Sequence, residues 1–470
     1  MRRVGLGRIR HGPDCFDQRR DDTTSGANFQ GTRAVDECDV LVIGGGPAGS
    51  TAAATLAARG RDVVLLEKAE HPRFHIGESL LPRNIPILER LGVADEVAAL
   101  AEYKPGAEFV DDETGGRSEF PFSLAPNQEY TSAWQVPRAA FDRVLFANAA
   151  RRGARTAERT RVVEVILAPA GQRARVVAEQ ADGSQRVLAP RFILDATGRD
   201  TLMAGQFGLK RSNKHNSTAA LHAHWRGVQR QLGAEPGFIT IHLAADGWFW
   251  MIPLPGDVMS VGFVGNSDVF KSRRGTAEEL YLQRIRQSPT ASARMAGAER
   301  ISDVAGAGNY SYRATQAWGE GYLMIGDAFA FLDPVFSSGV LLAMTAGELG
   351  ADVADAWVDS PARGRVLARR AERSLCRAMD SLGWLVYRIN TPVLRAMFMA
   401  PVNRFRMRDG LVALLAGNLA IDWKLRGPVL AFKAAYYGLT VARWFGYRQP
   451  ATAPLTAMPA LPSVDVVPAG

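Results

Sequence analysis

The chain of 470 residues is 47% hydrophobic and 22% charged, so it buries a large core and is expected to divide into two or three subdomains. Its net charge of +8 comes without a basic run interleaved with aromatic residues, which argues against nucleic-acid binding and would suit an acidic partner. Three scattered cysteines and no uncharged apolar stretch of ~18–20 residues exclude a disulfide framework and a spanning helix, so we expect a cytoplasmic protein without a metal site.

The first ordered elements predict a strand, a helix and a second strand. Residues 1–34 are polar and aperiodic, and we expect a disordered leader there. Asp39–Ile43 is a continuous apolar run, typical of a buried parallel strand. An Ala-rich helix is predicted from Pro47 to Arg59 and a strand over Asp62–Leu66, so this βαβ unit opens a doubly wound domain.

The turn between the first strand and the helix reads G-x-G-x-x-G, with an acid 18 residues beyond its last glycine. Gly44 permits the tight turn, Gly46 lets the backbone approach a pyrophosphate, and Gly49 permits close helix packing. The helix N-terminus offers free N–H groups to phosphate, and Glu67 is placed to bind ribose hydroxyls. The alternative is a structural turn without a nucleotide. We predict cofactor contacts at Gly44, Gly46, Pro47, Ala48, Gly49, Ser50, Glu67 and Lys68.

Later segments predict further strands of this domain and an inserted sheet. Phe192–Gly198 and Gly321–Asp327 are apolar runs that end in glycine turns, and the second leads into a helix from Val340. The alternating runs between them predict an antiparallel sheet, with strands at Phe238–Leu243, Trp248–Leu254 and Val258–Val264.

The expected subdomains follow from these elements. The nucleotide-binding domain takes 36–211, with an excursion near 105–135, and resumes over 306–362, while 212–305 forms the sheet domain. From 363 to 448 the pattern is helical, with breaks at Pro392, Pro401 and Pro428, and 449–470 carries five prolines and is expected to be a loose tail.

Three motifs in order carry a resemblance to a known family. The G-x-G-x-x-G turn is followed by W-x-W-x-I-P at Trp248–Pro253 and by D-P-V-F-S-S-G-V at Asp333–Val340. Together they resemble the flavin-dependent halogenases, in the phenol/pyrrole branch, within the superfamily of FAD-dependent aromatic hydroxylases. The resemblance covers roughly residues 38–447. It also includes Gly77–Pro82, Lys104–Phe109 and Arg395–Pro401.

The resemblance implies that the nucleotide is FAD. Gly326-Asp327 is similar to the second dinucleotide motif of the hydroxylases, whose Asp binds the ribityl chain, and Arg138 matches their arginine near FAD; alternatively Arg138 is a surface cation. The helix near Gly339 would stabilise the reduced flavin with its N-terminus. The fold class is then α/β, a doubly wound FAD-binding Rossmann-type domain with an inserted antiparallel β-sheet domain and a C-terminal helical subdomain. Implied cofactor contacts are Gly77, Ser79, Arg138, Asp327, Pro334, Gly339 and Val340.

The resemblance also implies the mechanism of the family. FAD reduced by a separate reductase reacts with O₂ to a C4a-hydroperoxyflavin, and chloride or bromide attacks it to give hypohalous acid. A lysine, matched here by Lys104, passes the halogen to an electron-rich ring, and its side chain should enter a cavity between the sheet domain and the helical cap. The alternative for Lys104 is an exposed strand-edge lysine.

Two further roles come from the family. Ser338 and Gly339 would hold the halide at a helix N-terminus, although a serine there also serves as an N-cap. Trp248 and Trp250 share one face of a strand and would keep the organic substrate away from the flavin; alternatively they are an aromatic core pair. The predicted catalytic residues are Lys104, Trp248 and Trp250.

The sequence also departs from the family pattern. Phe336 stands where tryptophan halogenases carry a glutamate, which argues against free tryptophan as substrate, and Leu342 stands where many phenol-type relatives have histidine. His75 and Glu78 are expected near the flavin face, with His75 more typical of a loop residue than of a base.

The predicted function is a FADH2-dependent halogenase acting on a phenol or pyrrole, free or bound to an acyl or peptidyl carrier protein, in secondary metabolism. Expected partners are a flavin reductase and the aromatic substrate, and the protein is expected to be a monomer or homodimer. The alternatives are a flavin monooxygenase or an isoprenoid-chain reductase on the same fold, and a flavoprotein whose catalysis has decayed.

Overall fold

The computed structural model describes residues 35–126, 129–169, 171–213, 218–230, 236–308, 311–418 and 423–446. The predicted leader (1–34) and tail (449–470) lie outside these residues.

The first sheet confirms the predicted doubly wound domain. Its β1 (Asp36–Ile43) pairs in parallel with β2 (Val63–Leu66) and with β10 (Gln185–Asp195), and β10 pairs in parallel with β20 (Tyr322–Met324). The paired segments Val40–Ile43, Val63–Leu66, Phe192–Leu194 and Tyr322–Met324 are apolar and buried, as is typical of parallel strands with both faces covered. The sheet is completed by β7 (Arg155–Ala157) and β19 (Trp318–Gly319) at its edges and by the β8 (Thr160–Ile166) and β9 (Arg175–Gln180) hairpin on β10.

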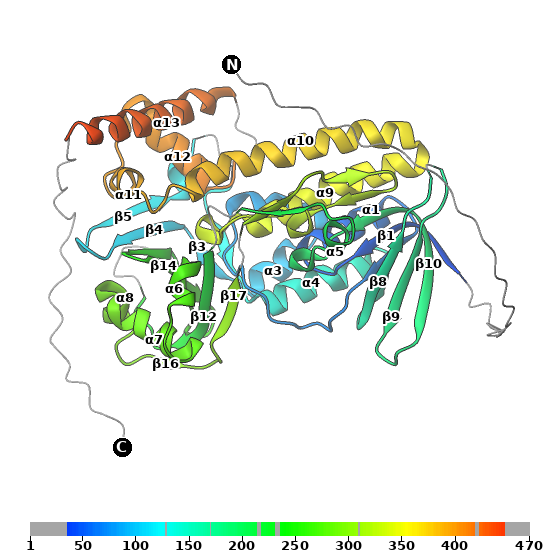
Figure 1. The fold of residues 1–470 in the computed structure, drawn as a ribbon, viewed down its shortest axis with the longest axis horizontal. Helices are drawn as coiled ribbons and strands as arrows, with labels where there is room; N and C mark the ends of the chain where they lie inside the picture. The colour runs from blue at the N-terminus through cyan, green and yellow to red at the C-terminus, as the bar shows by residue number, and fades with distance from the viewer. Residues whose placement is uncertain are drawn as a thin grey trace, which may run out of the picture. The chain divides into compact units, whose positions relative to one another are not determined.

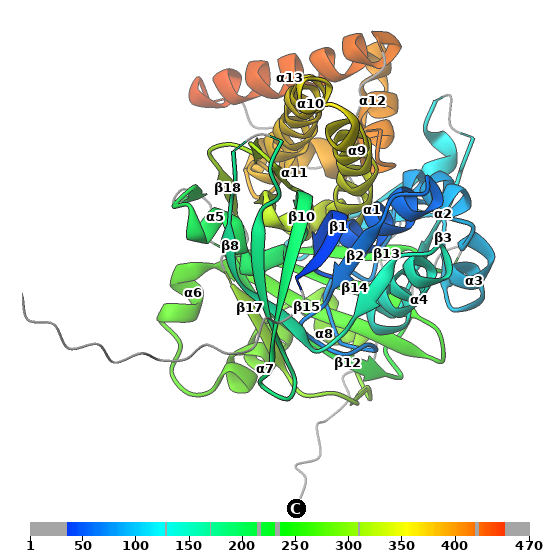
Figure 2. The ribbon, with the colours of Figure 1, turned by 90° about the vertical axis from the view of Figure 1, so that its right-hand side faces the viewer.

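Long helices cover this sheet. The predicted helix after the glycine turn is α1 (Pro47–Ala58), and it packs against α9 (Gly339–Asp359) and α4 (Arg138–Arg151). In turn, α9 packs against α10 (Pro361–Val386), as Figures 1 and 2 both show. Shorter helices are α2 (Ile85–Leu91), α3 (Ala94–Ala99) and α5 (Leu202–Gln206).

The second sheet has the strand order β16-β12-β15-β14-β13-β4-β5, with β17 also pairing β12. It is antiparallel as predicted, except that β13 and β4 run parallel, because β4 and β5 enter from the excursion near 105–135 rather than by a hairpin. The strands are β4 (Gly106–Asp111), β5 (Arg117–Pro121), β12 (Thr218–Arg226), β13 (Ile239–Ala244), β14 (Gly247–Leu254), β15 (Val258–Asn266), β16 (Glu299–Arg300) and β17 (Ala305–Gly308).

The two faces of the second sheet have different neighbours. Trp248, Trp250 and Ile252 belong to the main core shared with the first sheet. Phe249 and Met251, which alternate with them, belong to a separate core that includes side chains of α7 (Ala277–Gln287) and α8 (Pro289–Arg294). One face is therefore turned toward the nucleotide-binding domain.

The remaining small elements are α6 (Ser267–Lys271), the ribbon of β3 (Glu102–Lys104) and β6 (Ala133–Gln135), and the sheet of β11 (Lys210–Ser212), β18 (Tyr312–Ala314) and β21 (Ala330–Phe331).

The C-terminal region is helical, with α11 (Pro392–Met399), α12 (Met407–Leu415) and α13 (Trp423–Trp444) following α10. Pro392 begins α11 and Pro401 separates it from α12, as predicted, but the break expected at Pro428 is wrong, because this proline lies inside α13. The backbone N–H that a proline lacks would have donated to a carbonyl oxygen in the first turn of α13. The ring of Pro428 packs on α12, where a Cβ on Gly410 would lie 3.0 Å from it. Among the described helices, none is long and apolar enough to cross a membrane.

Candidate functional site

A cavity of about 830 Å³ lies where the carboxyl ends of the first sheet meet the inner face of the second. Its walls come from the glycine turn, the loop after β2, the start of α4, β13 and β14, and the N-terminus of α9. Most of the predicted site residues line it, and only Gly49, Ser50, Lys104 and Ser338 do not. Those that do are Gly44, Gly46, Pro47, Ala48, Glu67, Lys68, Gly77, Ser79, Arg138, Trp248, Trp250, Asp327, Pro334, Gly339 and Val340.

Each glycine of the turn meets a different steric limit. Gly44 has φ +108°, and a Cβ there would lie 2.3 Å from the Ala196 carbonyl oxygen. A Cβ on Gly49 would lie 1.9 Å from the carbonyl oxygen of Gly44, so only glycine lets α1 start this close to the strand. At Gly46 the nearest atom, Nη2 of Arg73, is 3.7 Å from such a Cβ. Gly46 is therefore the open position, where a ligand can reach the backbone.

Glu67, at the end of β2, closes the turn. Its carboxylate accepts hydrogen bonds from the backbone N–H of Gly45 (2.8 Å) and of Ala69 (2.9 Å). Arg73, which the sequence reading missed, forms an ion pair with Glu67 (3.1 Å) and with Asp142 (3.3 Å). The carboxylate thus fixes the loop and also faces the cavity.

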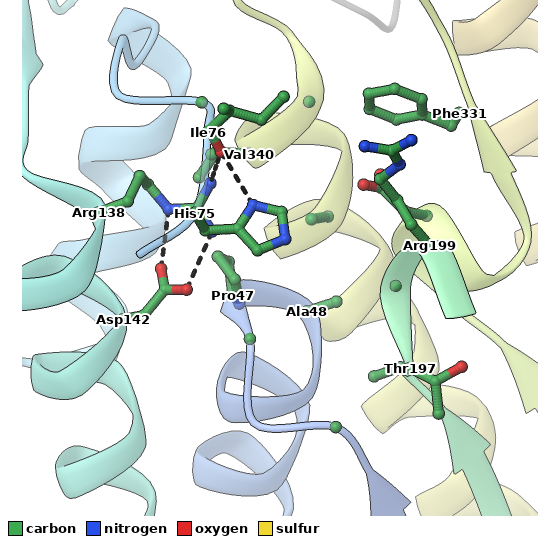
Figure 3. Close-up of a pocket in the computed structure, with 18 of the residues that line it drawn as sticks. Pro47, Ala48, His75, Ile76, Arg138, Asp142, Thr197, Arg199, Phe331 and Val340 are labelled. Atoms are coloured by element: carbon green, nitrogen blue, oxygen red, sulfur yellow. Dashed lines mark hydrogen bonds and ion pairs between the residues drawn. The ribbon is translucent and has the colours of Figure 1, made fainter. Parts of the chain in front are cut away.

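Arg138 is 5% exposed and lines the cavity, so the alternative of a surface cation is wrong. Its guanidinium donates to both carboxylate oxygens of Asp142 (2.8 and 3.0 Å) and to the carbonyl oxygen of Ile76 (2.5 Å), as Figure 3 shows. Gly77 has φ +102°, and a Cβ there would lie 2.8 Å from Nη1 of Arg138. The arginine therefore holds the loop after β2 against α4.

Two histidines near the cavity carry opposite shifts. Burial lowers the pKa of His75 to about 4, so this side chain is neutral at pH 7. Burial also opposes the charge of His224, but the 2.8 Å hydrogen bond to Glu78 and the charge of that carboxylate outweigh it, so the pKa of His224 is raised. Glu78 lines the cavity, and the ring of Phe74 lies edge-on to His224, with centroids 5.5 Å apart.

The two tryptophans of β14 do lie on one face, with ring centroids 5.9 Å apart, and both line the cavity. Trp248 and Trp250 also belong to the main core, with exposed fractions of 2% and 6%. They are therefore core residues and cavity-lining residues at the same time. The indole of Trp250 occupies a slot at Gly262 of β15, where a Cβ would fall 2.2 Å from the ring, and its Nε1 donates to Oγ of Ser260 (3.2 Å). The sequence gives no signal for this slot, because the two strands meet only in the sheet.

At the far wall, β20 ends just before Gly326, and Asp327 faces the cavity. Burial raises the pKa of Asp327 to about 7. Gly339 and Val340, the first residues of α9, also line the cavity. Ser338 occupies the N-cap position, yet its side chain makes no capping hydrogen bond, so the N-cap alternative does not describe it. Ser337 before it has the left-handed φ of +56°.

Lys104 is 1% exposed, so the alternative of an exposed edge lysine is wrong. Its Nζ donates to the carbonyl oxygen of Leu80 (2.8 Å) and lies 5.1 Å from the centroid of the Phe122 ring. Burial lowers the pKa of Lys104 to about 7. The lysine does not line the described cavity, but Leu80 directly follows Ser79, which does. The oxygens Ser79 Oγ and Gln135 Oε1, on residues joined by a β-bridge, are buried without a hydrogen-bond partner.

The described residues contain no group of three His, Cys, Asp or Glu side chains that could hold a metal ion.

Comparison with known proteins identifies related sequences and folds. The family described as FAD binding domain matches residues 37–354. A tryptophan 2-halogenase of Chondromyces crocatus is 36% identical, over 66% of this chain and 60% of its own length. A 1H-pyrrole-2-carbonyl-[peptidyl-carrier protein] brominase of Pseudoalteromonas luteoviolacea is 33% identical, over 68% of this chain and 78% of its own length. A flavoprotein/dehydrogenase from Cytophaga hutchinsonii has a similar structure, with TM-score 0.78, 29% identity and coverage of 87% of this chain and 100% of that one.

Proposed function

The chain belongs to the flavin-dependent halogenases with an FAD-binding domain, and on this premise we propose that it installs chlorine or bromine on a phenol or pyrrole ring. The observation that carries the proposal is the shared cavity: the glycine turn opens into it from one side, and Trp248 and Trp250 form part of its opposite wall. A plain nucleotide-binding domain would not need that second wall.

The cavity residues fit FAD. Gly46 leaves the backbone at the N-terminus of α1 open for a diphosphate, and the carboxylate of Glu67 is placed for ribose hydroxyls. Asp327 faces the cavity from the end of β20, where a ribityl chain would be held, and the N-terminus of α9 would meet the electron-rich edge of the flavin ring. Reduced FAD, when bound there, would supply with O₂ the activated oxygen that converts a halide into an electrophile.

The start of α9 is the proposed halide site. The N–H groups of a first helical turn have no partners within the helix, and the helix dipole favours an anion there. Gly339 presents this end of α9 to the cavity, and no cap hydrogen bond from Ser338 competes for its N–H groups. Chloride or bromide would thus be held on the cavity side of the helix.

Lys104 is proposed to carry the halogen to the ring. With a pKa of about 7, a large share of its amine is neutral at neutral pH, which leaves a nitrogen lone pair for the electrophile. Hypohalous acid and the neutral amine give an N–X bond and water. The ring carbon then takes the halogen without the electron pair of the N–X bond, which stays on the nitrogen, and the proton lost by the ring restores the amine. The unpartnered oxygens of Ser79 and Gln135 are the polar groups proposed to line the way to the lysine.

The proposed substrate class is supported by the residue at position 336. Phe336 packs with Phe109 and Phe398, with ring centroids 6.5 and 6.1 Å away, so no carboxylate is available there to take the ring proton. A phenol or a pyrrole is activated by its own oxygen or nitrogen and depends less on such a base. The name of the pyrrole brominase supports a substrate held on a carrier protein, and tryptophan is the competing substrate that the name of the first relative suggests.

The proposed redox partner is a separate flavin reductase, because the chain carries one complete G-x-G-x-x-G turn and no second one for a nicotinamide. If NADPH alone reduced the bound FAD at the rate of turnover, the proposal of a separate reductase would be wrong.

The test is mass spectrometry of reactions that contain the protein, FAD, a flavin reductase, bromide or chloride, and a panel of phenols, pyrroles, carrier-bound pyrroles and tryptophan. We expect a mass shift of one halogen on a phenol or pyrrole, absent without reductase and in Lys104→Ala. Hydroxylation without halogen would instead make the enzyme a monooxygenase, and halogenated tryptophan would overturn the proposed substrate class.

A further inference from the structure

The large apolar side chains that are most exposed are concentrated in one region. Among the described residues, the five highest exposed fractions of large hydrophobic side chains all fall between 402 and 445. Trp444 is 80% and Phe445 is 86% exposed. The other three are Val402, Phe405 and Leu430. Outside this region the highest such fraction is 55%, at Val35, so the most exposed large apolar side chains are concentrated in one part of the surface.

The exposed side chains form a continuous stripe on α13. Leu430, Tyr437, Val441 and Trp444 are separated by seven, four and three residues, the spacing that keeps side chains on one face of a helix. The opposite face is buried through Leu425, Val429, Phe432 and Tyr436. In Figures 1 and 2, α13 lies at the outer margin of the helical region, so its exposed face is turned away from the rest of the fold.

The charge along α13 has one sign. The sequence from Trp423 to Trp444 contains Lys424, Arg426, Lys433 and Arg443 and no Asp or Glu. The short helical turn Arg404–Arg406, which contacts α13, adds two exposed arginines beside Phe405, of which Arg406 is paired with Asp409 (3.0 Å). The exposed apolar side chains of α13 therefore share this helix with cations and with no carboxylate, and their partner is expected to be anionic.

This charge argues against a second copy of the chain as the partner. A second copy of the chain would bring two such helices together with cations on both and no carboxylate on either, which is unfavourable. Apolar and aromatic side chains bordered by Lys and Arg are instead the pattern of helices that lie in the headgroup region of anionic membranes.

We propose that α13 is a peripheral membrane-binding element that lays its Leu430–Trp444 stripe, together with Phe445, into the surface of an anionic bilayer. Lys424, Arg426 and Arg443 would contact lipid phosphates, while the indole of Trp444 and the ring of Phe445 enter the boundary between headgroups and acyl chains. The enzyme would thus work at a lipid surface without any spanning segment.

The test is flotation of the full-length FAD-bound protein with vesicles of phosphatidylcholine alone and of phosphatidylcholine and phosphatidylglycerol in equal parts. We expect binding to the anionic vesicles to be stronger by about tenfold or more. Trp444→Ser with Phe445→Ser should weaken binding to the anionic vesicles about tenfold, whereas Val366→Ser, an exposed valine of α10, should not. Arg426→Glu with Arg443→Glu should remove the preference for phosphatidylglycerol, and Arg273→Glu, an exposed control, should leave it unchanged.

Two results would overturn the proposal: no binding of the wild-type protein to anionic vesicles, or equal binding by the Trp444/Phe445 variant. Sedimentation that shows a dimer dissociated by the same two substitutions would assign the stripe to a second copy. The amount of FAD that each variant binds shows whether that variant is folded. Halogenation of a water-soluble phenol should be unchanged in these variants, so failure of this proposal is distinguishable from failure of the proposed enzymatic function.

Discussion

The amine of Lys104 donates a 2.8 Å hydrogen bond to the carbonyl oxygen of Leu80, the residue that follows the cavity-lining Ser79. One extended segment thus has the flavin cavity on one side and a buried lysine on the other. This arrangement ties the proposed halogen carrier to the wall of the cavity, and it has consequences for stability.

Lys104→Met should stabilise the protein and abolish halogenation. Burial lowers the pKa of Lys104 to about 7. Between pH ~7 and ~10.5 the unfolded chain therefore holds a proton that the folded one does not, so the free energy of unfolding of the wild type rises with pH across this window. Below pH ~7 Lys104 is charged in the folded and the unfolded chain, so the full cost of burying its charge lowers the free energy of unfolding. Lys104→Met should not show this rise. At pH 6 it should be more stable than the wild type by about 1.4 kcal/mol for each unit by which burial lowers the pKa of Lys104.

Urea unfolding from pH 6 to 10 measures this difference, with Lys271→Met as the control because Lys271 is an exposed lysine. Parallel pH profiles of the wild type and Lys104→Met would contradict the burial of this amine. FAD binding should be retained in both variants.

Gly262→Ala should displace Trp250. A Cβ at this position would lie 2.2 Å from the indole, so the ring must leave its slot, and overpacking of this kind costs about 1–3 kcal/mol. Denaturant unfolding and the near-UV circular dichroism of tryptophan report both effects. Gly308→Ala is a matched strand glycine whose Cβ would have only an ordinary 3.9 Å contact. Equal stability of the two variants would mean that Trp250 does not occupy the slot.

Gly46→Ala should separate folding from cofactor binding. Its Cβ would make only an ordinary contact, 3.7 Å from the nearest atom, so the free energy of unfolding of the apoprotein should change by less than about 1 kcal/mol. FAD affinity should fall about tenfold or more, because the methyl group blocks the approach of the diphosphate. Gly49→Ala, whose Cβ would lie 1.9 Å from a backbone oxygen, should lose both stability and FAD. Fluorescence titration with FAD measures the affinities, and unchanged affinity in Gly46→Ala would place the diphosphate elsewhere.

Glu78→Gln should lower the pKa of His224. Burial would lower this pKa, and the hydrogen bond and charge of Glu78 raise it instead, so removing the charge leaves burial unopposed. Because the folded-state pKa is raised, the pair contributes stability that is present below the unfolded pKa of ~6.5 and is lost as pH rises through the folded value. Proton NMR titration of the histidine ring, assigned with His224→Gln, measures the shift. The same pKa in wild type and Glu78→Gln would show that the two side chains do not interact.

The sequence by itself determined the nucleotide-binding unit and the family. Gly49 is needed because of a contact within five residues, and Gly44 has a positive φ in the same turn, so a short pattern is enough to predict them, although Gly44 also lies against the distant Ala196. The alternation of Trp248 and Trp250 in a strand is likewise local, and their common face was predicted correctly.

Only the tertiary structure decided what surrounds these residues. The slot at Gly262, the pairing of His224 with Glu78 146 positions away, and the bonds of Arg73 to Glu67 and Asp142 depend on how separate segments meet. The burial that lowers the pKa of Lys104 has the same origin, and so does the packing of Pro428, inside α13, against α12. Periodicity reports which side of an element is apolar, but the partner that covers that side, and hence the charge and access of a side chain, is set by long-range packing.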